Sequence, residues 1–411
     1  MKKNMLIVHG GAPTAVINAS LYGAIKQAKK SGMVNHIWGA RGGSHAVLTG
    51  DFIDLGNLPE ETVELLPITP ASFIGSSRYQ VTESDYERMV DVLVEKDIQW
   101  LLFTGGNGSM DTCGKIAKCV AKKAPGKGIC VTGIPKTIDN DIAVTDHAPG
   151  FGSAARYVAA TVRDICADVA SLPIHVCVVE TMGRNAGWLT AAAALAGGSR
   201  KTGPHLIYVP EIAFDEEAFL DNAKTLYDAY GGVVVVASEG LRDKTGKPIV
   251  EPIFQVGRSV YYGDVSAHLC NLVIRKLGIK ARSEKPGLIG RCAAAYQSSV
   301  DRAEAIEAGT RAVQAALAGK TAVMVGFKRV STRPYRCETV LIPVEEVMLH
   351  ERTLPAEFLT AGTATGTAIA TGTAGSATGI ATATAGGTIP SEAFVNWCEP
   401  LIGDELPPFA R

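Results

Sequence analysis

The chain has 411 residues, too many for a single hydrophobic core of common size, so we expect two domains. Its 40 Lys and Arg residues nearly balance its 41 Asp and Glu residues, and the formal net charge is −1. This balance lacks the electrostatic footprint of a general nucleic-acid binder, so we expect no nucleic-acid partner and only local anion sites.

The nine cysteines form no Cys-x-x-Cys pair, and several lie in apolar runs, where a reduced Cys acts as a small hydrophobe. This pattern is typical of a reducing compartment, and we expect a cytoplasmic protein. No stretch approaches membrane-spanning length with purely apolar character, so we expect no membrane partner. The N-terminal apolar run is interrupted at His9, too early for the hydrophobic region of a signal peptide.

The first predicted elements are a buried strand at residues 5–8 and a helix at residues 15–30, joined by a turn that contains Gly10 and Gly11. A helix N-terminus presents unpaired N–H donors, so this turn is a candidate phosphate site. The alternative is that the glycines serve packing alone. A loop further on carries Arg78, which is either a cation directed at the site or a solvated surface group.

Two polar loops follow the next two predicted strands. The strand at residues 100–103 leads into Gly105–Ser109 and a helix at residues 109–122. The strand at residues 129–131 leads into Pro135–Asp141. Ligands of open α/β sheets bind beyond the carboxyl ends of the strands, so we expect both loops to open into one cleft.

These loops carry different chemistry. Gly106 and Gly108 have no Cβ, which lets the backbone approach a ligand closely, although a tight strand-to-helix turn is the alternative. The second loop offers an ammonium, a hydroxyl and two carboxylates, on Lys136, Thr137, Asp139 and Asp141. Two such carboxylates are costly where water is excluded unless they pair or bind metal; the alternative is an Asx-turn with solvated acids. Together the loops form an inventory for phosphoryl transfer.

The second half of the chain continues to alternate strands and helices, which predicts mostly parallel sheets covered by helices. We expect strands at residues 176–179, 206–209, 232–237 and 322–327, and helices at residues 154–171, 186–196, 215–230, 267–277 and 301–318. Arg184 follows the first of these strands and is suited to binding an anionic group, or else makes a surface pair. Glu239 follows another and either accepts from sugar hydroxyls or caps a turn. Residues 280–291 read as two basic ends around an apolar turn.

Residues 360–388 are built almost wholly of Ala, Thr and Gly. We interpret them as a low-complexity insertion without a catalytic part, exposed and mobile. Residues 389–411 resume ordinary composition, so we expect them to close the core fold.

In this order, these residues resemble the phosphofructokinase family. Pro-Lys-Thr-Ile-Asp-Asn-Asp, then Met-Gly-Arg, then Ser-Glu-Gly form a joint pattern that chance rarely supplies. Residues 10–20 and 146–155 are most similar to the pyrophosphate-using branch. The resemblance implies two Rossmann-like lobes with the active site in the cleft between them. It assigns residues 1–172 to a phosphoryl-donor lobe and residues 173–350 to a sugar-phosphate lobe, with the chain crossing back between lobes.

The resemblance also implies a 6-phosphofructokinase of glycolysis. Such an enzyme transfers a phosphoryl group from ATP or pyrophosphate to the C1 hydroxyl of fructose 6-phosphate, giving fructose 1,6-bisphosphate. The implied partners are these substrates, Mg²⁺ as cofactor, and further copies of the chain in a homodimer or homotetramer that shares sugar-phosphate sites across an interface.

The family's roles carry over residue by residue. Asp139 would be the base, Thr137 would touch the sugar and the transferring phosphoryl group, and Asp141 would support Mg²⁺. Arg184 would stabilise developing charge. The sugar phosphate would be bound by Thr137, Asp139, Met182, Gly183, Arg184, Glu239, Arg282 and Arg291. The donor would be bound by Gly10, Gly11, Arg78, Gly106, Asn107, Gly108, Ser109 and Lys136.

Several positions depart from the family pattern. Asn107 stands where the family carries a carboxylate on Mg²⁺, and an amide is a poorer ligand. Gly108 stands where pyrophosphate users carry a second acid that takes the place of the ATP α-phosphate, whereas Lys136 is typical of pyrophosphate users. These signals conflict, and we slightly favour ATP as the donor. His175 replaces a cation, and Leu288 replaces a His or Tyr, in the sugar-phosphate site. These departures leave two alternatives open: a non-catalytic sugar-phosphate-binding relative, or a kinase of a different sugar phosphate.

Overall fold

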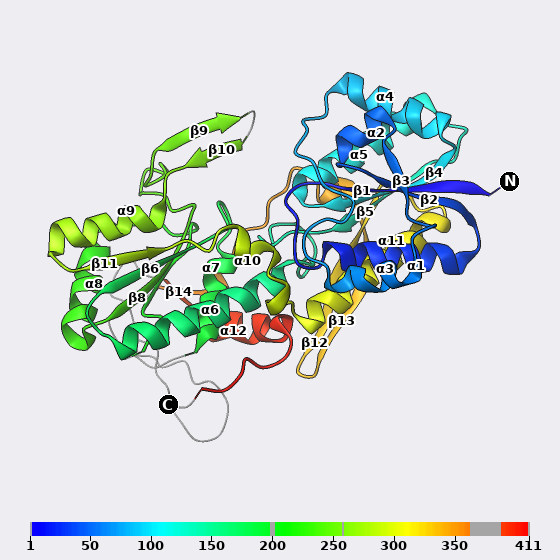
Figure 1. Cartoon of the computed structure of the whole chain (residues 1–411). Helices are drawn as coiled ribbons and strands as arrows, with labels where there is room; N and C mark the ends of the chain where they lie inside the picture. Colours follow the sequence, from blue (N-terminus) through cyan, green and yellow to red (C-terminus); the bar gives the residue numbers. More distant parts are fainter. Residues whose placement is uncertain (1, 198–201, 257–258, 362–387, 410–411) are drawn as a thin grey trace. The chain divides into compact units, whose positions relative to one another are not determined.

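The computed structural model describes residues 2–197, 202–256, 259–361 and 388–409. The chain forms two units, and each is assembled from two stretches of sequence (Figure 1). Unit 1 comprises Met1–Ala154 and Arg291–Arg352, and unit 2 comprises Ala155–Gly290 and Thr353–Arg411. These boundaries differ from the predicted ranges 1–172 and 173–350, because the chain returns to unit 1 and completes its sheet.

Unit 1 is built on a seven-stranded sheet. Its strands lie in the order β13 (Tyr335–Pro343), β12 (Val323–Thr332), β5 (Cys130–Pro135), β4 (Ile98–Gly105), β1 (Lys3–His9), β2 (Val34–Ala40) and β3 (Phe52–Asp54). The five inner strands are parallel, and the two edge strands pair antiparallel to their neighbours. The strands β1, β4 and β5 are in register, with Leu6 opposite Leu101 and Leu101 opposite Val131.

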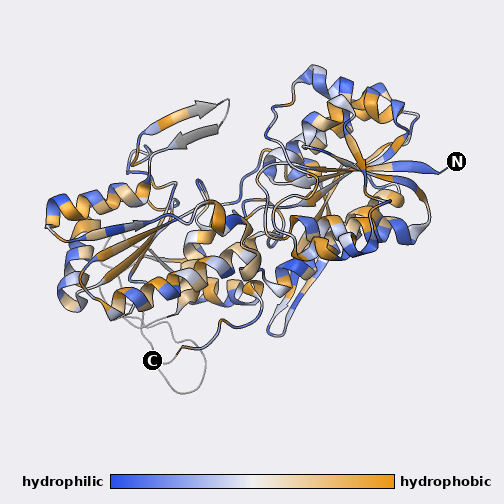
Figure 2. Cartoon of the chain, viewed as in Figure 1, coloured by the Kyte–Doolittle hydropathy of each residue, from blue (hydrophilic) through white to orange (hydrophobic). Residues whose placement is uncertain are grey.

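Helices cover both faces of this sheet. One face carries α1 (Ile17–Ser31), α3 (Glu60–Leu65) and α11 (Ser299–Leu317), and the other carries α2 (Ser44–Thr49), α4 (Glu83–Glu95) and α5 (Asn107–Lys123) (Figure 1). Successive residues of a strand point to opposite faces. Met5 and Ile7 accordingly pack in the cluster that includes Leu21, whereas Leu6 and Val8 pack in the cluster that includes Met110. The inner strands are therefore apolar on both sides, in keeping with their hydrophobic colouring in Figure 2.

Unit 2 has a six-stranded sheet and a separate hairpin. The sheet order is β11 (Ala281–Glu284), β6 (Val176–Thr181), β8 (Val233–Ser238), β7 (Leu206–Tyr208), β15 (Thr388–Pro390) and β14 (Leu359–Ala361). The first four strands are parallel, and β15 pairs antiparallel with β7 and β14. The hairpin consists of β9 (Pro252–Val256) and β10 (Ser259–Tyr262).

One face of this sheet packs on α8 (Glu216–Tyr230) and α9 (Val265–Leu272) through Phe219 and Leu269. The other face carries α6 (Phe151–Ser171), α7 (Trp188–Ala192) and α12 (Glu392–Cys398) (Figure 1). An aromatic cluster holds the C-terminal segment on α7, where Trp188 lies 5.0 Å from Trp397 between ring centroids. Among the described residues, no helix is long and apolar enough to span a membrane.

The prediction of two lobes with mostly parallel sheets is confirmed. The predicted helix at residues 186–196 is α7 followed by a 3₁₀ turn, and the one at residues 267–277 is α9 followed by a π-helix. Residues 280–282 and 290–291 were expected to bracket an apolar turn, which is wrong: residues 281–284 form the edge strand β11, and the short helix α10 (Leu288–Cys292) begins before residue 290. The low-complexity prediction for residues 360–388 falls mainly on residues 362–387, which lie outside the described residues.

Candidate active site

The turn after β1 packs closely against the start of α5. The Ser109 side chain lies so near that a Cβ on Gly10 would be 2.4 Å from Ser109 Oγ, and a Cβ on Gly105 would be 2.0 Å from it. At Gly105 a Cβ would also lie 2.3 Å from Ser109 Cβ, so that position requires glycine, whereas at Gly10 the Ser109 hydroxyl would have to turn away. The predicted donor residues Gly10 and Ser109 therefore lie together.

The ammonium of Lys136 lies at the same turn. Its Nζ donates to the carbonyl oxygen of Ala12 at 2.6 Å and would lie 3.4 Å from a Cβ on Gly11. Lys136 is only 3% exposed. Burial lowers the pKa of Lys136 to about 8, although the carboxylates of Asp139 and Asp141 oppose that shift. A buried ammonium beside a glycine turn is suited to binding a phosphate group.

The two predicted loops contact each other, because they follow the adjacent parallel strands β4 and β5. The backbone N of Lys136 donates to the carbonyl oxygen of Gly105 at 3.0 Å. Asn107 Nδ2 donates to Asp141 Oδ2 at 2.8 Å and to the Asp141 carbonyl oxygen at 3.0 Å. Thr137 Oγ1 donates to Asp141 Oδ1 at 3.0 Å. The two loops therefore contact each other at one edge of the unit 1 sheet, while their opening into a common cleft stays a prediction.

Oxygen atoms suited to a divalent cation remain at this contact. Within the described part of the chain, Asn107 Oδ1 is buried and has no hydrogen-bond partner. Burial raises the pKa of Asp141, against hydrogen bonds from Thr137 and Asn107. A nearby cation would stabilise both the unpartnered oxygen and the buried carboxylate. The residues present therefore fit Mg²⁺ even though an amide replaces the family's carboxylate.

The candidate base Asp139 is half-buried in the middle of the second loop. Its backbone N donates to Thr137 Oγ1 at 3.0 Å, and its carboxylate raises the pKa of Lys136, so negative charge lies near that ammonium. The next residue, Asn140, has a φ of 53°, a left-handed conformation that Asn adopts more readily than most residues. Ala148 N donates to Asn140 Oδ1 at 3.1 Å and holds this bend.

Two arginines add positive charge around Lys136. Arg78 lies in a loop that contacts the turn after β1, called the donor turn below because it carries the candidate phosphoryl-donor residues Gly10 and Gly11. Gly11 N donates to the carbonyl oxygen of Ser77 at 3.1 Å. The charges of Arg291 and Arg78 both lower the pKa of Lys136. Arg291 Nε is buried without a partner among the residues that the structure describes. Arg291, predicted to bind the sugar phosphate, therefore lies in unit 1 with the donor residues.

In unit 2, the loops after β6 and β8 contact each other as their parallel register predicts. Ser238 Oγ donates to the carbonyl oxygen of Gly183 at 2.8 Å, and Gly183 N donates to Glu239 Oε1 at 3.4 Å. A Cβ on Gly240 would lie 1.7 Å from the carbonyl oxygen of Arg184, so only glycine fits there. Met182, Gly183, Arg184 and Glu239 are thus brought together.

The guanidinium of Arg184 has a defined environment in unit 2. Its carbon lies 5.4 Å from the centroid of the Tyr262 ring, within the range of a cation–π contact. Its Nε is buried without a hydrogen-bond partner in the described ranges. This donor is available to an anionic ligand.

Arg282 lies on the edge strand β11, at the end of the strands opposite to the Met182–Arg184 loop. It is opposite Cys177 near the start of β6, five residues before Met182, which corresponds to roughly 16 Å along a strand. Burial and the charges of Arg282 and Lys280 lower the pKa of His175, which therefore supplies no cation at neutral pH. Within one chain, the structure does not bring Arg282 to the Met182–Arg184 loop. Leu288 is 67% exposed on α10.

Sequence reasoning missed the groups that support the loop Pro135–Asp141, called the base loop below because it carries the candidate base Asp139. Asp301 Oδ1 accepts from Gly150 N at 2.8 Å, and Glu304 on the same helix contacts His147. The available signal was the position of two acids on the face of α11 that also carries Ala305, a buried residue. Acids on the buried stripe of a helix require partners.

Comparisons with known proteins match this arrangement. Residues 4–316 match the family model described as Phosphofructokinase. A pyrophosphate–fructose 6-phosphate 1-phosphotransferase of Xanthomonas campestris pv. campestris (strain B100) is 39% identical over 367 residues, which cover 87% of each chain. A sulfofructose kinase of Alkalicoccus urumqiensis is 34% identical over 356 residues, which cover 86% of this chain and 91% of that protein. The crystal structure of a pyrophosphate-dependent phosphofructokinase from Marinobacter aquaeolei is similar with a TM-score of 0.83 and 32% identity, covering 99% of this chain and 94% of that one.

The family model spans most of the chain, including the glycine turn, the base loop and both loops of unit 2. The Xanthomonas and Marinobacter relatives align with this chain over most of its length and most of their own, so the similarity extends over both units. The chain belongs to the phosphofructokinase family of phosphotransferases, and it is similar to members of the pyrophosphate-using branch.

Proposed function

We propose that the protein is a 6-phosphofructokinase that transfers a phosphoryl group from pyrophosphate to the C1 hydroxyl of fructose 6-phosphate. The observation that carries this proposal is the buried ammonium of Lys136, set in the glycine turn beside Asp139. The names of the Xanthomonas and Marinobacter relatives support pyrophosphate as donor. Both observations weigh against the slight preference for ATP drawn from the sequence.

In this proposal Asp139 takes the proton from the C1 hydroxyl as the oxygen attacks the donor. Thr137 binds the sugar and the transferring phosphoryl group, while Lys136 and Arg78 bind the donor phosphates. Mg²⁺, held by Asp141 and Asn107, would screen the charge on the donor oxygens. In-line transfer requires a positioned hydroxyl and cations around the phosphoryl oxygens, and these residue types supply both.

ATP is a second candidate donor because of the space at Gly108. A Cβ on Gly108 would meet no atom within 4 Å, and the residue is exposed at the start of α5. The family's pyrophosphate users carry an acid here that excludes ATP by charge and volume. Without that acid, the donor site of this chain has no such barrier at this position.

The acceptor site supports fructose 6-phosphate through Met182, Gly183, Arg184 and Glu239. Arg282 on β11 lies opposite Cys177, near the start of β6, and is too far from this loop to join it in the same chain, which favours a symmetric oligomer in which another copy supplies it. The neutral His175 leaves one cation fewer than the family pattern. A fructose with a singly charged C6 group is therefore a second candidate acceptor, in keeping with the name of the Alkalicoccus relative.

The test combines donors and acceptors with the purified protein and Mg²⁺. Pyrophosphate and ATP are each offered with fructose 6-phosphate and with 6-deoxy-6-sulfofructose, and bisphosphate or sulfo-phosphate product is measured. We expect the highest kcat/KM with pyrophosphate and fructose 6-phosphate. Binding of fructose 6-phosphate without turnover of either donor would instead identify a non-catalytic relative.

Asp139→Asn tests the role of the base. We expect turnover to fall by about 10³-fold or more, because general-base catalysis contributes up to roughly 10⁴-fold, while substrate binding measured by calorimetry stays nearly intact. Asp51→Asn is the matched control, since Asp51 is a half-exposed carboxylate that pairs with Arg41 at 3.5 Å outside the site. An unchanged rate in Asp139→Asn would remove Asp139 from the base role.

A further inference from the structure

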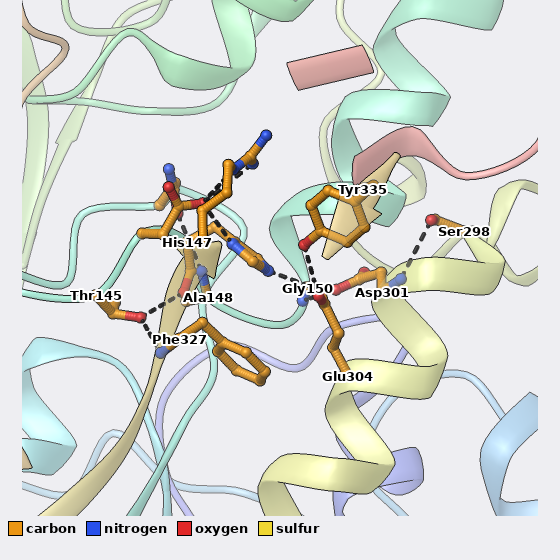
Figure 3. A network of polar contacts seen from close by, with 12 residues as sticks. Thr145, His147, Ala148, Gly150, Ser298, Asp301, Glu304, Phe327 and Tyr335 are labelled. Atoms are coloured by element: carbon orange, nitrogen blue, oxygen red, sulfur yellow. Dashed lines mark hydrogen bonds and ion pairs between the residues drawn. The ribbon is translucent and has the colours of Figure 1, made fainter. Parts of the chain in front are cut away.

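His147 lies in the segment that leads from Asp141 to α6. Figure 3 shows it between Thr145 and Ala148 of this segment and Glu304 of α11. It is only 2% exposed, and its ring stacks on Phe327 with centroids 5.1 Å apart. Nδ1 lies 2.9 Å from Asp146 Oδ2, and Nε2 lies 2.7 Å from Glu304 Oε2. Ionised carboxylates only accept hydrogen bonds, and a neutral imidazole donates from one nitrogen only. Both contacts are therefore hydrogen bonds when the ring carries two protons.

The titratable groups around this ring come from several elements: Asp146 on its own segment, Glu304 on α11, Arg329 on β12, Tyr335 and Cys337 on β13, and Arg352 after β13. Asp301 on α11 lies near Glu304 and accepts from Gly150 N rather than from the ring. Asp146 Oδ2 also accepts from Arg329 Nη2 at 3.1 Å, and Glu304 Oε1 accepts from Tyr335 OH at 2.6 Å. The two carboxylates that contact the ring, Asp146 and Glu304, both favour its imidazolium form. A neutral ring donates from one nitrogen only, so it would lose one of its two hydrogen bonds to a carboxylate.

The segment that contains His147 also forms hydrogen bonds to the residues on either side of the candidate base Asp139. Thr137 N donates to the carbonyl oxygen of Pro149 at 3.1 Å, and Ala148 N donates to Asn140 Oδ1 at 3.1 Å. Arg352 N donates to the carbonyl oxygen of Asp141 at 2.8 Å. Residues 148–150, which follow His147 directly, therefore set the backbone path on both sides of Asp139.

We propose that His147 is a positioning residue for phosphoryl transfer: its doubly hydrogen-bonded ring fastens the segment behind Asp139 to α11 and the β12–β13 hairpin. The proposal rests on the proposed function, because it assigns the supported loop a catalytic task. Cys337 Sγ lies within 4.8 Å of the ligand-type atoms of His147 and Glu304. A doubly protonated ring has no lone pair for a metal, so the contacts describe a hydrogen-bonded network.

The pH range of this contact follows from the charges around it. Burial disfavours the imidazolium, but Glu304 and Asp146 outweigh burial and raise the pKa of His147 to about 9, from an ordinary value of 6.5. Because the folded value is the higher one, the stabilising contribution is fully present below pH 6.5 and is lost as pH rises through about 9. Burial raises the pKa of Cys337 to about 12, so its thiol stays neutral over this window.

The first test is kinetic. We expect His147→Gln to lower kcat by roughly tenfold to a hundredfold with little change in KM, because small displacements of a catalytic group have effects of this order. The fall in wild-type kcat through pH 9 should be absent from the variant. His36→Gln is the matched control: His36 also pairs with an aspartate, at 2.9 Å from Asp54, but lies on the edge of the sheet away from the loop. A wild-type kcat and pH profile in His147→Gln would overturn the proposal.

The second test does not depend on turnover. Hydrogen exchange of the Thr137, Ala148 and Gly150 amides, corrected for the intrinsic effect of pH, should lose protection as pH rises through 9 in the wild type. Glu304→Gln removes one carboxylate and should move that midpoint to lower pH in a protein that still folds. Protection that stays constant from pH 7 to pH 10 would refute the role of His147, even if the wild-type protein turned over neither donor.

Discussion

Replacing Lys136 with Met tests whether the buried ammonium binds the phosphoryl donor. In the free protein, no bound phosphate stabilises the Lys136 ammonium. Burial therefore lowers the pKa of Lys136 from 10.5 to about 8. At 1.36 kcal/mol per pKa unit, this net shift corresponds to a penalty of about 3 kcal/mol on the charged form. A multiply charged phosphate would offset that cost, because it restores the charge balance around the ammonium.

Two quantities follow from this pKa. At pH 8 about half of the Lys136 side chains are protonated, so binding of pyrophosphate should take up about half a proton per site. Removing the ammonium should weaken binding by about a hundredfold, the equivalent of about 3 kcal/mol. Without ligand, the unfolded chain holds this proton more tightly than the folded one, so the contribution of Lys136 to folding stability rises as pH increases from about 8 to 10.5.

Titration calorimetry with pyrophosphate and Mg²⁺ at pH 8, without acceptor, measures both quantities. Proton uptake is obtained from the binding heats in two buffers of different ionisation enthalpy. Subtracting the proton uptake of Lys136→Met from that of the wild type removes the contribution of protons that pyrophosphate itself gains or loses. Lys123→Met is the control, since Lys123 pairs with Asp91 on the surface. Equal proton uptake in wild type and Lys136→Met, or affinities within about threefold, would refute the reasoning.

Two further predictions concern glycines of the two sites. Gly108→Asp should suppress any turnover with ATP and leave turnover with pyrophosphate nearly unchanged, because the new carboxylate enters open space in front of the donor; undiminished ATP turnover would contradict our account of the loop. Gly240→Ala should destabilise the protein by about 1–3 kcal/mol and raise KM for the acceptor, because its Cβ would lie 1.7 Å from the carbonyl oxygen of Arg184. Gly126→Ala, where a Cβ meets no atom within 4 Å, is the control in thermal unfolding and kinetics.

The parts of the site that follow directly from neighbouring strands were predictable from sequence. The two loops after β4 and β5 contact each other because parallel strands in register end at the same edge, and the loops after β6 and β8 do so for the same reason. Short apolar runs identify such strands well, since both of their faces are buried. The contact of Asn107 with Asp141 is a consequence of this rule.

Long-range returns of the chain were not predictable in the same way. The hairpin β12–β13 joins the unit 1 sheet from residues 323–343, and only residues 322–327 carried an apolar strand pattern. The position of Arg291 near Lys136 likewise depends on where the chain crosses from unit 2 to unit 1, which no local pattern encodes. The support of His147 by Glu304, 157 residues apart, has the same origin.

The return of residues 291–352 to unit 1 has a consequence for synthesis on the ribosome. A nascent chain that ends before α11 has translated every residue of the donor turn and the base loop, yet α11, β12 and β13 are still missing from that unit. Val325 and Phe327, which join the same buried cluster as Ile134 and Leu102, arrive only in the last quarter of translation. Unit 1 therefore cannot complete its core while only its N-terminal part has been synthesised. Its exposed apolar face needs protection, by a chaperone or by the growing chain itself, until the final strands emerge from the ribosome.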